Sequence, residues 1–271
     1  GGYHEGIIGA TLFRHFAVSL DNDRSLMTLR RPEDYTPPEG AGVLPLVFDD
    51  GGKPFADARV RIADGGAKPI QLAVDLGASH VVSLNETEGN GLLAPAGSIA
   101  ATIGRGVSGA VLGKVGRIAS LELGPFKLEH LVATFPDKAY QNPRGMDSKD
   151  GNLGNGALSR FLVTFDYAHE RLVLFPAAGF TEPSEWDMSG MQGDLTGKGT
   201  VEVSRVLAGS PAEAAGIRQG DTLVRIAGEE VTQASYFTLK ERFKKDGETV
   251  TVELRRKDKP VLASLKLRRL V

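Results

Sequence analysis

The chain of 271 residues contains no cysteine, and it has a single tryptophan. Without cysteine it can form no disulfide bond, no thiolate metal site and no cysteine nucleophile. Neither sign of charge is in large excess, because 32 basic and 34 acidic residues give a net charge of -2. A chain so close to neutrality has no broad basic surface, so we expect no nucleic acid as its main partner.

Long hydrophobic runs are absent as well. No apolar stretch approaches the ~20 residues that a bilayer-spanning helix needs, so the sequence predicts no membrane-spanning segment. What is abundant is glycine and proline, with 34 and 14 residues. This composition favours short strands and many turns, and the length is enough for about two domains. The histidines show no metal-ligand spacing; they are His4, His15, His80, His130 and His169.

Two segments of the chain are alike at a constant separation of 145 residues. The matching pairs are Gly6 with Gly151, Gly9 with Gly154, Phe16 with Phe161, Val18 with Val163, and Asp21 with Asp166. Beyond Asp21, one extra residue in the later copy is expected to bring Leu26 opposite Leu172. A repeat of this size indicates a duplicated lobe rather than an array of short repeats.

One acidic turn stands out for its chemistry. It follows the apolar run of residues 70–74 and consists of Asp75, Leu76, Gly77, Ala78 and Ser79. A strand that ends in such a turn holds its carboxylate rigidly, and glycine lets the backbone approach closely. A carboxylate held in this way can share a proton with a second carboxylate and act as general acid and base. The same pattern also fits an ordinary hairpin with an acidic tip.

The repeat bears on where a second carboxylate would be. Asp75 lies 76 residues before Gly151, so its counterpart would lie 76 residues before Gly6, upstream of the first residue. We therefore expect the chain to begin within a lobe, with the matching acid outside this sequence.

Hydrophobic alternation and turn residues predict the organisation of the chain. We expect half of a first lobe plus a linker in residues 1–40, an all-β lobe in residues 41–182, and a smaller domain in residues 187–271. The large lobe should contain a short helix at 156–160 and strands at 43–47, 58–62, 70–74, 81–84, 99–103, 111–115, 118–123, 127–135, 161–165 and 171–174.

In the smaller domain, capping residues predict a short helix. Ser210 suits its N-cap, Pro211 its first position and Gly216 its C-terminal cap. A longer helix is expected at 235–245, and strands are expected at 201–206, 222–226, 249–255 and 262–267.

The acidic turn resembles the active-site turn of retropepsin-like aspartic proteases, Asp-Thr/Ser-Gly-Ala/Ser. Ile7-Ile8-Gly9 and Asn152-Leu153-Gly154 resemble the apolar-apolar-Gly motif of the same family, although Asn152 replaces an apolar residue. Three glycines between the motifs stand where the family has its flap; they are Gly104, Gly106 and Gly109. The same glycines match a dinucleotide fingerprint, but the residues after them favour a strand and not the helix that the fingerprint requires.

This resemblance implies a mainly β protein with a retropepsin-like acid protease β-barrel lobe. It further implies an aspartic endopeptidase that acts on a peptide or protein substrate, with Asp75 as one catalytic residue and no metal or cofactor. Its second aspartate would come from the upstream half of the first lobe or from a homodimer mate.

Leu76 departs from this family, which has a hydroxyl-bearing residue there that bonds across the two turns. Leucine cannot make that bond. The alternative function is therefore a non-catalytic peptide-binding scaffold with a degenerate protease lobe.

The C-terminal segment resembles bacterial PDZ domains. The matching residues are Gly209-Ser210-Pro211-Ala212, Ala215-Gly216-Ile217 and Gly220-Asp221. This resemblance implies peptide binding by strand addition, which would recruit substrate or regulate the protease. We expect the groove between the strand with Val201 and Val203 and the helix at 235–245, with Gly190 and Met191 in the carboxylate loop. A domain that serves only for packing is the alternative. The domain pairing suggests a bacterial protein of the periplasm or cell envelope.

Overall fold

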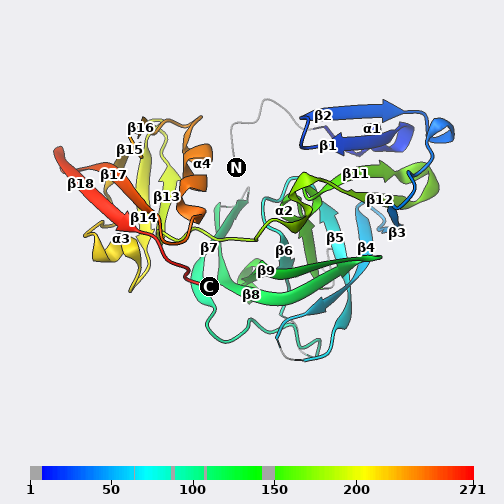
Figure 1. Ribbon diagram of the computed structural model, residues 1–271, viewed down its shortest axis with the longest axis horizontal. Helices are drawn as coiled ribbons and strands as arrows, with labels where there is room; N and C mark the ends of the chain where they lie inside the picture. The colour runs from blue at the N-terminus through cyan, green and yellow to red at the C-terminus, as the bar shows by residue number, and fades with distance from the viewer. Residues whose placement is uncertain (1–7, 64, 87–88, 107–108, 142–149) are drawn as a thin grey trace. The chain divides into compact units, whose positions relative to one another are not determined.

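The computed structural model describes residues 8–63, 65–86, 89–106, 109–141 and 150–271. They form two compact units, of which the larger ends at residue 184 and the smaller begins at residue 185. Strands dominate both units, which confirms the mainly β class (Figure 1). The separate half-lobe expected in residues 1–40, and the boundaries expected for the other two domains, stay predictions.

The larger unit is built on a twelve-stranded sheet. Its strands are β1 (Ala17–Asp21), β2 (Leu26–Arg30), β3 (Gly42–Phe48), β4 (Pro54–Arg61), β5 (Lys68–Asp75), β6 (Val82–Leu84), β7 (Ile99–Gly106), β8 (Gly109–Leu123), β9 (Phe126–Pro136), β10 (Gly151–Gly154), β11 (Phe161–Asp166) and β12 (Arg171–Pro176). Its helices are α1 (Ala10–His15), α2 (Asn155–Leu158) and the 3-10 turns Pro32–Asp34, Lys138–Tyr140, Tyr167–His169 and Ala178–Thr181.

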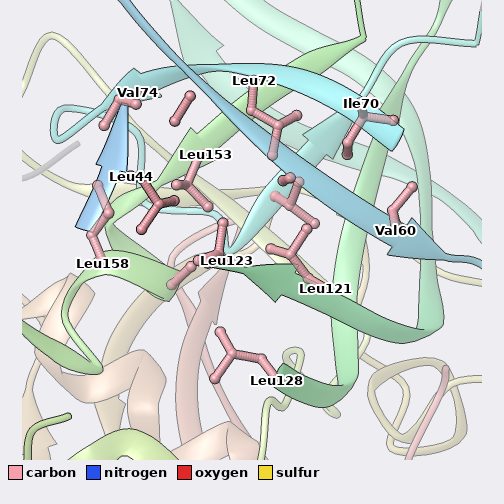
Figure 2. Close-up of a cluster of buried hydrophobic side chains, with 14 of the residues drawn as sticks. Leu44, Val60, Ile70, Leu72, Val74, Leu121, Leu123, Leu128, Leu153 and Leu158 are labelled. Carbon is pink, nitrogen blue, oxygen red and sulfur yellow. The ribbon is translucent and has the colours of Figure 1, made fainter. Parts of the chain in front are cut away.

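Part of this sheet closes on itself as a barrel. The strand order is β2-β1-β11-β12-β3-β4-β5-β10-β6-β9-β8-β7, and β4 also pairs with β8. The pairings from β4 through β5, β10, β6, β9 and β8 therefore return to β4. Leu72, Leu121, Leu123 and Leu153 are buried in the apolar interior of this ring, where Figure 2 shows them together. This closed ring holds the end of β5, and thus Asp75, in a fixed position.

Strand β8 differs from the sequence-based expectation. Two strands were expected, at 111–115 and 118–123, but a single strand runs from Gly109 to Leu123. Gly113 and Gly116 do not mark turns in it. A Cβ atom at Gly113 would lie 2.4 Å from the carbonyl oxygen of Phe135, and one at Gly116 would lie 2.2 Å from Ser98 Oγ. These glycines allow close packing against neighbouring segments, which a local sequence pattern does not distinguish from a turn.

The repeat is visible in the pairing of β1 with β11. Ser19 lies directly opposite Thr164, which is its own counterpart at a separation of 145 residues. On either side of this pair, Val18 faces Phe165 and Leu20 faces Val163. This exchange of partners is what a local two-fold axis through Ser19 and Thr164 produces. Figure 1 shows the two hairpins joined in this way, in blue and green.

The structure corrects the expected alignment beyond Asp21. Asp21 pairs with Leu26 in the first hairpin, and Asp166 pairs with Arg171 in the second. Both turns thus have the same length, and the counterpart of Leu26 is Arg171 rather than Leu172. The leucine match was misleading because side-chain identity does not determine register, whereas turn length does.

The smaller unit contains a six-stranded sheet of order β13-β14-β15-β17-β18, with β16 paired to β15. Its elements are β13 (Met191–Leu195), β14 (Val201–Val206), α3 (Pro211–Ala214), β15 (Thr222–Ile226), β16 (Glu229–Glu230), α4 (Tyr236–Leu239), the 3-10 turn Lys240–Lys244, β17 (Thr249–Arg256) and β18 (Lys259–Lys266). The Ser210 side chain caps α3 as expected, accepting a hydrogen bond from the Glu213 amide at 3.3 Å. Strand β13 was not predicted from the sequence. Its Met191 and Gln192 lie between Gly190 and Gly193, and glycine and the following Asp194 are both rare in strands.

In the part of the chain that the structure describes, no helix combines the length and the apolar character needed to cross a membrane.

Candidate active site

Asp75 is the last residue of β5, and it is held through both of its carboxylate oxygens. Oδ1 accepts a hydrogen bond from the Gly77 amide at 2.8 Å. Oδ2 accepts one from Asn152 Nδ2 at 3.1 Å. Asn152 belongs to β10, which runs parallel to β5 and places Gly154 opposite Asp75. The structure thus brings the acidic turn and the Asn152-Leu153-Gly154 motif together, as their resemblance to one family implied.

Glycine allows close contacts at two positions of this arrangement, a tight one at Gly77 and one that excludes any side chain at Gly154. A Cβ atom at Gly77 would lie 3.2 Å from Asp75 Oδ1, which would press on the carboxylate that the Gly77 amide binds. A Cβ atom at Gly154 would lie 2.1 Å from the carbonyl oxygen of His80. The amides of Asn155 and Gly156 donate to the carbonyl oxygens of Ala78 and His80, at 2.7 and 3.0 Å. The turn is therefore anchored to the start of α2.

The other residues of the turn have different surroundings. Leu76 is partly buried against the barrel core, whereas Ser79 is exposed. Leu76 also lines a shallow pocket of about 290 Å³, together with Asn155 and residues of the first hairpin such as Met27. A larger pocket of about 460 Å³ includes Pro69 and Ile70. These residues lie near the start of β5, at the opposite end of the strand from Asp75.

Asn152 and His80 are site residues that the sequence did not assign. Asn152 donates to Asp75, while its own Oδ1 is buried without a hydrogen-bond partner. Nε2 of His80 is likewise buried without a partner. Burial lowers the pKa of His80, and the nearby Asp75 carboxylate and a hydrogen bond to the Asn152 backbone oppose this shift. The sequence signal for Asn152 was its polar side chain at an apolar motif position.

The three predicted flap glycines lie on the hairpin of β7 and β8. Gly104 pairs with Val111, and Gly106 pairs with Gly109, whose φ is +112°. Residues 107 and 108 lie outside the described residues. The strand continues directly from Gly109 into β8, so no helix follows these glycines and the dinucleotide fingerprint has no structural counterpart here.

The predicted peptide groove needs to be relocated. Val201 and Val203 are fully buried, and their strand β14 lies between β13 and β15. A strand that is paired on both sides cannot accept a peptide by strand addition. Among the described residues, the terminal strand on this side of the sheet is β13, which begins at Met191 directly after Gly190. A groove for strand addition therefore requires the edge of β13.

Within the described ranges, no group of three or more His, Asp and Glu side chains is placed to hold a metal ion.

Comparisons with known families agree with this geometry. Residues 58–157 match the aspartyl protease family, and residues 186–267 match the PDZ domain family. The first match includes Asp75 and β10, and the second includes β13 and α4. No curated protein matches the chain.

Several solved structures are similar to the chain at low identity. A retropepsin-like aspartic protease from Rickettsia conorii is 17% identical with a TM-score of 0.31, and the match covers 52% of this chain and 95% of that one. A serine endoprotease from Yersinia pestis is 12% identical with a TM-score of 0.33, over 98% of this chain and 100% of that one.

An aminopeptidase N family protein from Idiomarina loihiensis is 23% identical with a TM-score of 0.28, over 32% of this chain. The present chain spans only 15% of the length of that protein. All of these TM-scores are low, so the family matches and the chain's own topology carry the assignment. The chain thus combines a domain that matches the aspartyl protease family with a C-terminal domain that matches the PDZ domain family.

Proposed function

We propose that this chain is part of an aspartic endopeptidase in which Asp75 is one of two catalytic carboxylates. The observation that carries this proposal is the fixation of Asp75 at the end of a barrel strand, with both oxygens hydrogen-bonded from the turn and from β10. An acidic hairpin tip needs no such anchoring to a distant strand, so the geometry favours the catalytic interpretation over the ordinary turn.

The second carboxylate would come from a lobe related to this one by the two-fold axis through Ser19 and Thr164. By the repeat, Ile8 is the counterpart of Leu153 in β10. Leu153 is fully buried, whereas Ile8 is 59% exposed. This exposed site is suited to a strand equivalent to β5 that would carry the second aspartate. We propose that an upstream half of the first lobe, or a second copy of the chain, supplies that strand.

The chemistry follows from two carboxyl groups held close together. Two such groups cannot both ionise easily, so they share one proton. The ionised carboxylate accepts a proton from a water molecule, whose oxygen attacks the carbonyl carbon of the peptide bond. The protonated carboxyl group donates to the carbonyl oxygen. The C–N bond then breaks as the amide nitrogen takes up a proton, and the two peptide products leave.

Asn152 has a positioning role in this proposal. The family's hydroxyl residue after the aspartate is replaced by Leu76, which cannot donate a hydrogen bond. The Asn152 amide, 3.1 Å from Asp75 Oδ2, orients the carboxylate from the neighbouring strand of the same lobe. Asn152 thereby fixes the Asp75 carboxylate from within its own lobe, whereas the missing cross-turn bond at Leu76 is the feature that supports the alternative of an inactive scaffold.

The PDZ domain would bind peptides at the edge of β13, and would thereby recruit substrates or regulate the protease. Peptide binding at such an edge uses main-chain hydrogen bonds for affinity and side-chain pockets for specificity.

The decisive test is the Asp75→Asn substitution in the complete protease, assayed by cleavage of denatured casein between pH 3 and 7. Asparagine keeps the size of the side chain but cannot take up the water proton, so kcat/KM should fall by about a thousandfold or more. Asp50→Asn, at an exposed turn residue, is the matched control and should keep full activity. Equal cleavage by the Asp75→Asn variant would show that the assignment of Asp75 as a catalytic residue is wrong. No cleavage by either form would leave the scaffold alternative.

A further inference from the structure

The side chain of Tyr236 makes an unusual contact across the PDZ domain. Tyr236 is the first residue of α4, and the residue is only 2% exposed. Its hydroxyl oxygen accepts a hydrogen bond from the Gly193 amide at 3.1 Å. The same hydroxyl donates to the carbonyl oxygen of Gly193 at 3.2 Å. One side chain thus binds both main-chain polar groups of a single residue on β13.

These two groups are the ones that strand addition uses. In an antiparallel sheet, the amide and carbonyl of one residue point to the same side of the strand. On β13, the side that faces away from β14 is the edge available to an added strand. Because the amide and the carbonyl of Gly193 are both hydrogen-bonded to the Tyr236 hydroxyl, neither is available to an incoming peptide.

Gly193 itself is suited to this contact. A Cβ atom there would lie 2.6 Å from the Tyr236 hydroxyl and 2.8 Å from a methyl group of Val201. Any larger residue would separate the hydroxyl from the strand. The pairing of β13 with β14 is also irregular between Gln192 and Gly193, which re-aims the strand at this point.

A second internal contact occupies the loop before β13. The Ser189 amide donates to Asp187 Oδ1 at 2.9 Å, and the Ser189 hydroxyl donates to the same oxygen at 2.5 Å. The Met191 amide donates to Ser189 Oγ at 3.0 Å. The Met191 amide of the predicted carboxylate loop and the Ser189 amide just before the loop are therefore already bonded, and the Ser189 amide binds a carboxylate of the domain itself.

Lys240 connects the two contacts. Its Nζ lies 3.8 Å from Asp187 Oδ2 and 5.7 Å from the centre of the Tyr236 ring. The loop, α4 and the edge of β13 thus form one linked group of side chains.

We propose that the PDZ domain is self-closed. The Tyr236 hydroxyl takes the place of a bound peptide's main chain, and the Asp187 carboxylate takes the place of its C-terminal carboxylate. When Tyr236 moves away from Gly193, the domain admits an extended internal peptide segment. This proposal rests on the proposed peptide-binding function. An internal segment is favoured over a free C-terminus because the Asp187 carboxylate repels a second carboxylate and occupies its donors.

The test compares the full chain with its Tyr236→Phe variant, which keeps the ring and removes the hydroxyl. Tyr140→Phe, at an exposed tyrosine of the other unit, is the matched control. Amide hydrogen exchange at Gly193 should become about tenfold faster or more in Tyr236→Phe, with no change at Val203. The probe for binding is a fluorescein-labelled decapeptide rich in valine and alanine, as the free acid and as its C-terminal amide.

The Tyr236→Phe chain should bind this probe about tenfold more tightly than wild type, with the amide bound at least as well as the acid. Equal affinity of wild type and variant, or unchanged exchange at Gly193, would overturn self-closure while leaving peptide recruitment intact. Tighter binding of the acid would overturn the assigned role of Asp187. If neither chain binds the probe although exchange accelerates, the proposed gating of peptide entry fails together with peptide recruitment at this edge.

Discussion

The two copies of the 145-residue repeat form the same hairpin, yet their apolar faces meet different surroundings. Their pairing registers are identical, with Asp21 opposite Leu26 in one and Asp166 opposite Arg171 in the other. In the second copy, Leu172 and Leu174 are completely buried. Their counterparts in the first copy, Met27 and Leu29, are 42% and 44% exposed.

This difference shows that forming the hairpin and burying its apolar face have different requirements. Local pairing and an equal turn length suffice for the hairpin. Burial of its outer face depends on other strands, because β12 pairs with β3 and so joins the barrel. Strand β2 ends the sheet in the part of the chain that the structure describes. The exposed leucine and methionine of the first copy therefore form a surface suited to a second lobe, as the proposed two-carboxylate mechanism requires.

The largest effect is expected from a matched pair of core substitutions. Leu174→Ala should lower the free energy of unfolding of the larger unit by about 2–5 kcal/mol, because it removes buried methyl groups and leaves a cavity. Leu29→Ala should change it by less than about 0.5 kcal/mol, since its side chain is already half exposed. Urea unfolding followed by circular dichroism measures both. A comparable loss for Leu29→Ala would mean that a partner already covers this face in solution.

A smaller effect is expected at the axis between the copies. The hydroxyl groups of Ser19 and Thr164 lie 2.8 Å apart in a buried position. A double-mutant cycle with Ser19→Ala and Thr164→Val should give a coupling energy of about 1 kcal/mol, the net contribution of one buried hydrogen bond. Strictly additive effects of the two substitutions would contradict this contact, and with it the close pairing of the copies.

The smallest effect concerns His80, whose carbonyl oxygen accepts a hydrogen bond from the Gly156 amide of the second copy. Burial lowers the pKa of His80 from 6.5, so the unfolded chain binds its proton more readily than the folded chain does. The neutral form of His80 should therefore contribute fully to the free energy of unfolding above pH 6.5, and this contribution should decline as the pH falls below that value. His80→Gln should lessen this decline, whereas His15→Gln, at an exposed residue of the first copy, should not. Urea unfolding at pH 7 and pH 5 compares them, and identical declines would refute the prediction.

Much of the architecture was predictable because its signals are local. The acidic turn after an apolar strand, the Ser210 cap and the constant spacing of the repeat depend on residues near one another in sequence. They led to a mainly β protein with a retropepsin-like barrel and a PDZ domain. The alignment error at Leu26 arose where side-chain identity was used in place of turn length.

The site was predictable only in part. Asp75 and Gly77 belong to one turn, so their mutual geometry follows from a few bonds. Asn152 reaches Asp75 from a strand far along the chain, and Tyr236 reaches Gly193 from another element. Neither contact has a local sequence signature, because each depends on which strands become neighbours.

The amino-acid sequence alone determined the turn chemistry, the helix cap, the duplication and the class of each domain, since these follow from short-range preferences and from spacing. Tertiary structure alone decided which strand is an edge, which leucines are covered and which distant side chain holds each main-chain or carboxylate oxygen. The physical reason is that strand pairing and burial are set by contacts between segments remote in sequence, and the free energy of such contacts is absent from any one segment.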